Sequence, residues 1–364
     1  MHSLVLAFLA ASFVVADAAS SPRPAFAFMA DTQQTDIKNS QQDSSSTTIA
    51  YRELKVNLPQ FNVDVPVATW FKPDDKLIDA PKTNDSVVYS HRISVKRIGS
   101  LLAGMNFIPE FVSKEFELSP TTSASIVYGN DLPYPSDRPV VFLAHGFLGS
   151  RFDLSHVAEE LASQGFVCLS PEYPESLASS YAKMEGLDRG VINDRLLDTM
   201  QTDLGIKASS YGIIGHSLGC GTATSTGDDS WTRVCIAGPP IRRDGVEVGG
   251  NTLSIVSLND GLVTMSRLES MLPSDFVRLQ ENTMMNAPLP KKSAIILTEP
   301  NHISFLAGNA NDAMVNFLSP LLPVAQALSI PVLDFDKYQE SRDSVQTASV
   351  VIPLITAYLK QYMM

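Results

Sequence analysis

The chain has 364 residues, of which 44% are hydrophobic and 18% charged, enough for one large globular domain with extensions or for two modest domains. Its formal net charge is −12, and no run of lysine and arginine offsets that charge. Because an acidic surface repels the phosphates of nucleic acids, we expect no nucleic-acid partner.

The first residues are predicted to be a targeting sequence rather than part of the fold. Residues 4–15 form an apolar run too short to span a bilayer, and residues 16–18 have the small-x-small pattern that signal peptidase cuts. The flank before the run lacks lysine and arginine, so a buried element at the start of the domain is the alternative interpretation. We expect a signal peptide over residues 1–18 and delivery to the secretory pathway.

Residues 19–50 are predicted to be a disordered spacer or transit segment, because they are rich in polar residues and have no hydrophobic periodicity. Residues 24–28 resemble the junction between signal and transit sequence in algae with complex plastids. We therefore expect an algal plastid as the destination, with an extracellular location as the alternative. An Asn-x-Ser sequon at Asn84 is a glycan acceptor only if it is exposed along that route.

Residues 51–364 are expected to form one domain in which strands and helices alternate. Short apolar runs predict strands at 65–71, 87–96, 140–144, 166–169, 211–214, 233–237, 253–258 and 294–297, and helical spacing predicts helices at 154–161, 191–204 and 344–362. Strands that are apolar on both faces are typical of a mostly parallel sheet flanked by helices. No later run is long enough for a transmembrane helix.

Two apolar stretches have open interpretations. Residues 98–112 are apolar, with Gly99, Gly104 and Pro109 between them, and could form core or a mobile lid over a site. Residues 265–289 contain several methionines, which suit an adaptable apolar pocket or simply fill core: Met265, Met271, Met284 and Met285.

The motif Gly215-His216-Ser217-Leu218-Gly219 follows a predicted strand and precedes a helical stretch. This strand–turn–helix context is that of a nucleophile elbow, in which glycines two before and two after the serine avoid a collision. The motif predicts the α/β-hydrolase fold with Ser217 as its nucleophile.

A serine hydroxyl needs a base, and the base needs an orienting carboxylate. In this fold the acid and the histidine follow the serine in that order, each after a later strand. His302 is the only histidine after the elbow, and Asp260 follows the predicted strand at 253–258. We expect the triad Ser217, Asp260 and His302, with Asp244, after the preceding strand, as the alternative acid.

The oxyanion formed during the reaction needs backbone donors. We expect one from the amide of Leu218 and the other from Phe147, in the loop after the strand at 140–144. His145 is expected to pack beneath that loop and His216 to shape the elbow, neither of them moving protons. No ligand cluster has zinc-like spacing, so we expect neither metal nor cofactor.

Residues 139–147, 157–169 and 215–219 resemble chlorophyllases and platelet-activating-factor acetylhydrolases, both serine esterases of this fold, and the resemblance extends over about residues 60–310. It implies hydrolysis of an ester with a long apolar arm. Chlorophyllases remove phytol from chlorophyll, and the acetylhydrolases cleave short acyl groups from phospholipids.

The chain departs from both groups in two places. They place the triad acid after the strand that here ends Ala237-Gly238-Pro239, where no acid stands. Plant chlorophyllases have Arg-Gly-Gly after the serine, whereas this chain has Leu-Gly-Cys. Asp260 therefore rests on the general order of the fold rather than on the resemblance.

The favoured hypothesis is a chlorophyllase-like carboxylesterase that acts on a small apolar ester. A lipid esterase of the acetylhydrolase or lipase kind is the second hypothesis, and a non-catalytic protein that binds an apolar ligand is the third. A peripheral membrane contact and the oligomeric state are left open.

Overall fold

The computed structural model describes residues 47–74, 87–104, 113–178, 181–241, 248–281, 288–321, 323 and 341–364. The main sheet contains β1 (Thr48–Leu58), β2 (Val63–Phe71), β5 (Ser125–Tyr128), β6 (Arg138–Ala144), β7 (Val167–Pro171), β8 (Ala208–His216), β9 (Thr232–Ile236), β10 (Thr252–Ser257), β11 (Val277–Gln280) and β12 (Lys292–Leu297). A separate hairpin pairs β3 (Tyr89–Ser94) with β4 (Ser113–Leu118).

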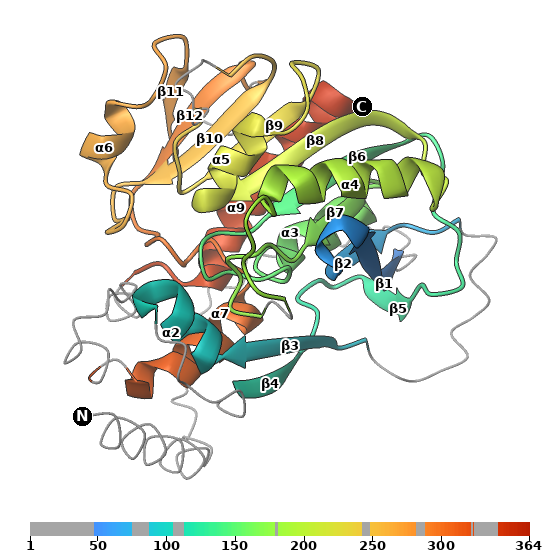
Figure 1. Ribbon diagram of the computed structural model, residues 1–364. Coiled ribbons are helices and arrows are strands. Elements are labelled where there is room, and N and C mark those ends of the chain that lie inside the picture. Colours follow the sequence, from blue (N-terminus) through green and yellow to red (C-terminus); the bar gives the residue numbers. More distant parts are fainter. Residues whose placement is uncertain are drawn as a thin grey trace, which may run out of the picture.

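The helices are α2 (Val95–Ala103), α3 (Ser155–Ser163), α4 (Arg189–Thr202), α5 (Leu218–Ser225), α6 (Met265–Glu269), α7 (Gly308–Leu318) and α9 (Ser344–Met363), with short 3-10 turns η1 (Pro59–Phe61) and η4 (Ser319–Leu321). The ten strands follow the order β11-β12-β10-β9-β8-β6-β7-β2-β1-β5. β2 is antiparallel to both of its neighbours, and the other pairs are parallel. This confirms the mostly parallel sheet flanked by helices (Figure 1).

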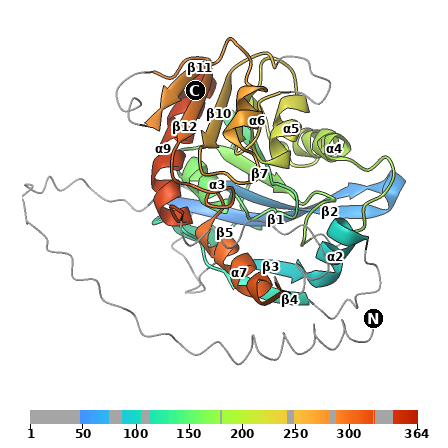
Figure 2. The same ribbon diagram turned by 90° about the vertical axis from the view of Figure 1, so that its left-hand side faces the viewer.

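Helices cover both faces of the sheet. α3 and α9 contact each other on one face, and α4 and α5 contact each other on the opposite face (Figures 1 and 2). β6 shows why its sequence is continuously apolar from Val140 on: Val141 and Leu143 join the core beneath α3 and α9, whereas Val140 and Phe142 join the core beneath α4. Because successive side chains of a strand point to opposite faces, a strand buried on both sides needs a continuous apolar run.

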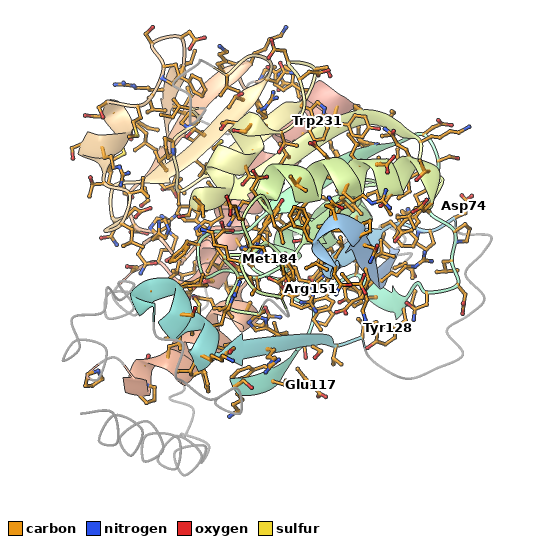
Figure 3. All side chains as sticks on the ribbon, in the orientation of Figure 1. Asp74, Glu117, Tyr128, Arg151, Met184 and Trp231 are labelled. Atoms are coloured by element: carbon orange, nitrogen blue, oxygen red, sulfur yellow. The ribbon has the colours of Figure 1, made fainter. Side chains whose placement is uncertain are left out.

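A third apolar cluster lies beside the sheet, where α2, the β3–β4 hairpin and α7 gather (Figure 2). Two of its buried members, Leu148 and Ile303, come from the loops after β6 and β12. Arg151 connects this part to the sheet (Figure 3). Its guanidinium donates to Glu172 Oε2 at 2.8 Å, to Glu53 Oε1 in β1 at 3.2 Å and to a backbone carbonyl of β3.

The strand predicted at 87–96 is confirmed over residues 89–94 and is wrong at its carboxyl end, where residues 95 and 96 begin a helix. β3 ends at Ser94, whose hydroxyl accepts a hydrogen bond from the Arg97 amide at 3.2 Å and so begins α2. The helix ends at Ala103 and is capped by Gly104, which has a φ of +62°. The remainder of the proposed lid, 105–112, lies outside the described residues, so the lid stays a prediction.

Seven strands and helices were absent from the prediction: β1, β4, β5, β11, α2, α6 and α7. β1 begins at Thr48, three residues before the expected domain boundary.

The predicted signal peptide, the sequon at Asn84, and Met284 and Met285 of the methionine-rich segment lie outside the described residues. Cys168, Cys220 and Cys235 are free and buried. Among the helices of the described residues, none combines the length and apolarity needed to cross a membrane.

Candidate active site

Four loops meet at the carboxyl edge of the parallel strands, following β6, β8, β10 and β12. These strands lie close together in the sheet, in the order β12-β10-β9-β8-β6 (Figure 1). Because parallel strands end at the same edge, residues separated by more than 150 positions in the chain come together there. The loops and the adjoining ends of β8 and α5 carry every residue predicted for the site that falls within the described part of the chain.

Ser217 occupies the turn between β8 and α5, with a φ of +55° and a ψ of −116°. A residue with a side chain avoids this region, and holding it there costs about 1–3 kcal/mol. The flanking glycines show what the turn requires. A Cβ on Gly215 would lie 2.1 Å from the carbonyl oxygen of Gly219, and one on Gly219 would lie 2.0 Å from that of Ala144. The elbow therefore needs glycine at both positions.

The structure brings the three predicted triad side chains into one hydrogen-bonded series. The Ser217 hydroxyl lies 2.9 Å from His302 Nε2, and His302 Nδ1 lies 2.8 Å from Asp260 Oδ2. Since a carboxylate only accepts, Nδ1 carries the imidazole proton and Nε2 is left to accept from the serine. Asp244, the alternative acid, lies outside the described residues.

Asp260 is held in place by its second oxygen. Oδ1 accepts from the amides of Leu262 and Val263 at 2.9 and 2.8 Å, and the side chain is fully buried. The strand β10 ends at Ser257, so Asp260 lies in the turn beyond the strand and not at its last residue. The Ser257 hydroxyl donates to the Pro300 carbonyl at 2.5 Å and so connects this turn to the loop that carries His302.

His216 has the structural position expected for it. Its Nε2 donates to the backbone carbonyl of His302 at 3.0 Å, and the two imidazole rings lie 4.9 Å apart. Burial, with the nearby His302 as a second cause, lowers the pKa of His216 to about 3, so the ring is neutral at physiological pH. His216 therefore holds the loop that carries His302, and it does not exchange protons at physiological pH.

The two predicted oxyanion donors flank Ser217. Leu218 is the first residue of α5, where the helix dipole also favours negative charge. Phe147 lies in the loop after β6, and a Cβ built on the preceding Gly146 would lie 3.3 Å from Ser217 Cβ. Among the hydrogen bonds of the described residues, neither amide donates to a protein acceptor.

His145 lies beneath this loop, as expected. Its Nδ1 donates to the Gly146 carbonyl at 2.8 Å, and its Nε2 accepts from the Tyr173 amide at 3.0 Å. Burial first, and the charge of Arg189 second, hold the pKa of His145 well below its ordinary value. Both ring nitrogens are thus engaged within the protein.

Sequence reasoning missed Arg189, the first residue of α4, which also contacts this loop. The predicted helix began at Val191 and left it out. The sequence contained one signal for it. A positive charge in the first turn of a helix is unfavourable next to the positive end of the helix dipole, so the charge of Arg189 is expected to serve a contact elsewhere.

The strand order with its single reversed strand, together with a strained serine between β8 and α5, decides the architecture. The chain has the α/β-hydrolase fold. No protein-family model matches the sequence, and no curated protein matches it.

Solved structures of α/β hydrolases resemble it in three dimensions. A ferulic acid esterase from Streptomyces cinnamoneus is 14% identical, with a TM-score of 0.49, over 89% of this chain and 92% of the other. A dienelactone hydrolase from Anabaena variabilis is 16% identical, with a TM-score of 0.38, over 75% and 95%. A serine hydrolase without lid from Xanthomonas campestris is 10% identical, with a TM-score of 0.35, over 70% and 100%. The resemblance to chlorophyllases and to platelet-activating-factor acetylhydrolases stays a prediction.

Proposed function

We propose that this α/β-hydrolase is a serine carboxylesterase. The observation that carries the proposal is the series Ser217–His302–Asp260, with distances of 2.9 and 2.8 Å, built on a strained elbow beside two amides that have no acceptor among the described residues. Nucleophile, base and orienting acid within hydrogen-bond reach of one another form the arrangement that activates a hydroxyl.

The mechanism follows from this geometry. His302 Nε2 takes the proton of Ser217 as the hydroxyl oxygen bonds to the ester carbonyl carbon, and the carbonyl oxygen becomes an anion that the amides of Phe147 and Leu218 stabilise. The imidazolium then protonates the departing alcohol as the acyl-enzyme forms. A water molecule, deprotonated by the same nitrogen, releases the acid and restores Ser217.

The surroundings support an ester with an apolar arm. Phe147 and Leu262 are each 37% exposed, and Leu258 is 55% exposed; the first adjoins the proposed oxyanion site and the other two flank Asp260. Exposed large apolar side chains close to a catalytic group are typical of a surface that takes an apolar ligand. Chlorophyll, whose phytyl ester has such an arm, is the substrate we propose, in keeping with the sequence resemblance.

Hydrolysis of p-nitrophenyl butyrate, chlorophyll a and a short-chain phospholipid by the purified full chain tests the proposal. We expect release of p-nitrophenol and of chlorophyllide, with loss of at least about 10⁴-fold in kcat for Ser217→Ala. Ser225→Ala, at the other end of α5, is the matched control and should keep wild-type activity.

A fluorophosphonate probe should label the wild type and Ser225→Ala but not Ser217→Ala. Turnover of phospholipid alone would favour a lipid esterase over a chlorophyllase. A wild-type protein that hydrolyses no ester and takes no label would overturn the esterase proposal and favour a non-catalytic protein that binds an apolar ligand.

A further inference from the structure

The amide of the Gly146–Phe147 peptide is the proposed oxyanion donor. Three hydrogen bonds to the carbonyl oxygen of the same peptide hold it in place. The Gly146 carbonyl accepts from His145 Nδ1 at 2.8 Å, from the Gly149 amide at 3.3 Å and from the Arg189 guanidinium at 3.3 Å. A second guanidinium nitrogen of Arg189 donates to the His145 carbonyl at 2.7 Å.

The direction of a carbonyl determines the direction of the amide in the same peptide. A trans peptide is planar, and its N–H points opposite to its C=O. Donors that fix the Gly146 carbonyl therefore also fix the Phe147 N–H, which points away from Arg189. Hydrogen bonds to the carbonyl polarise the peptide, which makes its N–H a stronger donor.

Arg189 is itself immobilised. It is 5% exposed, its Nε donates to Glu175 Oε2 at 3.1 Å, and its guanidinium lies 4.5 Å from the centre of the Tyr173 ring. A guanidinium keeps its charge at every physiological pH and presents donors in a planar, rigid group. A fixed positive charge thus lies behind the carbonyl end of the peptide dipole.

We propose that Arg189 is a positioning residue for ester hydrolysis: it orients and polarises the Gly146–Phe147 peptide so that the Phe147 amide stabilises the oxyanion. The proposal rests on the esterase function proposed above. It assigns Arg189 no contact with the substrate, and its effect is confined to the transition state. Electrostatic stabilisation by a preorganised donor lowers the barrier because the donor does not have to reorient during the reaction.

Arg189→Met tests this, assayed with p-nitrophenyl butyrate and normalised to the fraction of sites that a fluorophosphonate labels at completion. Removing an oxyanion donor costs about 10²–10³-fold in kcat, so misorienting one should cost about 10–100-fold, with KM within about twofold of wild type. Inhibition by butylboronic acid, which forms a tetrahedral anion on the serine, should weaken by a similar factor. A merely structural role would not change kcat per labelled site.

Three further variants keep the test decisive. Arg189→Lys retains the charge and should recover part of the lost kcat, and Glu175→Gln, which weakens the anchor of the guanidinium, should reduce kcat about 2–5-fold. Arg195→Met, at a partly exposed position of α4, is the matched control and should match wild type.

If Arg189→Met folds and keeps wild-type kcat per labelled site, or raises only KM, the proposal is wrong. If that variant does not fold, wild-type kcat in both Arg189→Lys and Glu175→Gln overturns it. A wild-type protein inert towards all esters would instead refute the proposed function.

Discussion

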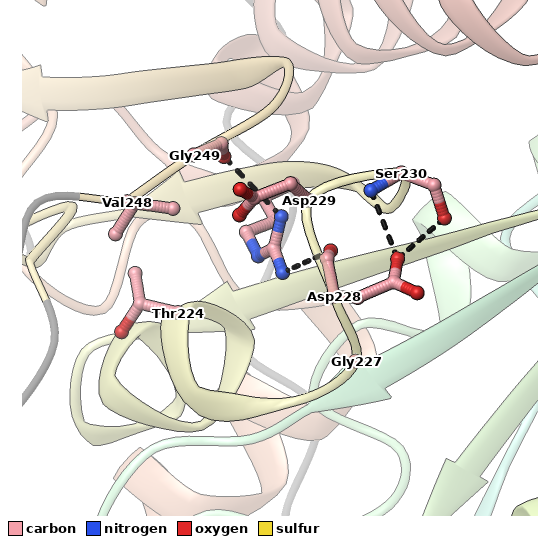
Figure 4. Close-up of a pocket in the computed structure, with 8 residues that line it drawn as sticks. Thr224, Gly227, Asp228, Asp229, Ser230, Val248 and Gly249 are labelled. Atoms are coloured by element: carbon pink, nitrogen blue, oxygen red, sulfur yellow. Dashed lines mark hydrogen bonds between the residues drawn. The ribbon is translucent and has the colours of Figure 1, made fainter.

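The two ends of α5 differ in whether their polar groups have hydrogen-bond partners. At the amino end, Ser217 has a strained backbone, and the neighbouring amides have no acceptor within the part of the chain that the structure describes. At the carboxyl end a surface pocket is lined by residues of the last turn of α5, the loop after it, β9 and the segment before β10 (Figure 4): Thr224, Gly227, Asp228, Asp229, Ser230, Arg233, Val248 and Gly249. There the 3% exposed Arg233 donates to five backbone carbonyls, two of them from Ala223 and Thr226 at the end of the helix.

The difference is one of hydrogen-bond satisfaction. Arg233 caps the carbonyls that a helix leaves without partners, and its charge complements the negative end of the helix dipole. Asp228 likewise turns inward on its own loop, accepting from the Ser230 amide and hydroxyl. In this pocket the Arg233 guanidinium and the Asp228 carboxylate are already bonded to the protein, whereas the amino end keeps two amide donors without an acceptor among the described residues. In this protein, hydrogen-bond donors without an acceptor indicate the catalytic site better than the presence of a surface pocket does.

The largest effect expected from this comparison is that of Asp260→Asn. The amide would stabilise the wrong tautomer of His302, and we expect kcat to fall about 10⁴-fold with the fold intact. Asp228→Asn, at the opposite end of α5, should leave kcat within about twofold. Steady-state kinetics with p-nitrophenyl butyrate measure both. Full activity in Asp260→Asn would favour Asp244 as the acid.

Arg233→Met should affect stability rather than chemistry. Several buried carbonyls would lose their donors at about 1–3 kcal/mol each, so we expect the free energy of unfolding to fall by at least about 3 kcal/mol. Urea denaturation measures the loss, and kcat per labelled site should not change. A fall in kcat without a loss of stability would contradict the division between the two ends.

The smallest effect concerns pH and Asp153, which lies in the loop after β6. Burial raises the pKa of Asp153 from its ordinary value of 3.8 to about 7. The folded protein therefore binds this proton more tightly than the unfolded chain, and the stability it contributes is full below about pH 4 and lost as the pH rises through 7.

Asp153→Asn removes this titration. The free energy of unfolding of the variant relative to wild type should rise by about 2–3 kcal/mol between pH 5 and pH 8, since about two pKa units are lost over that range and each corresponds to about 1.4 kcal/mol. Urea denaturation at both values measures it. A difference that is independent of pH would show that the carboxyl group is already ionised in the folded protein at pH 5.

The central strands buried on both faces were predictable, and the two edge strands of the main sheet were not. A strand with both faces buried, such as β6, needs a continuous apolar run whatever its neighbours are, and that run is visible in the sequence. β5 and β11 lie at the two edges of the sheet and contain mixed polar and apolar residues. Their strand conformation depends on the neighbour with which they pair, and the sequence does not state that neighbour.

The features of the candidate active site also fall into those that the sequence predicts and those that it does not. The glycine spacing around Ser217 and the order of acid and histidine are local or follow from the chain direction of the fold, so the sequence by itself determined where to look. Only the tertiary structure decided that Asp260 reaches His302 and that Arg189 holds the loop before Phe147. Those contacts join residues 42 and 43 positions apart. Whether such residues meet depends on how the strands order themselves in the sheet, which no local pattern encodes.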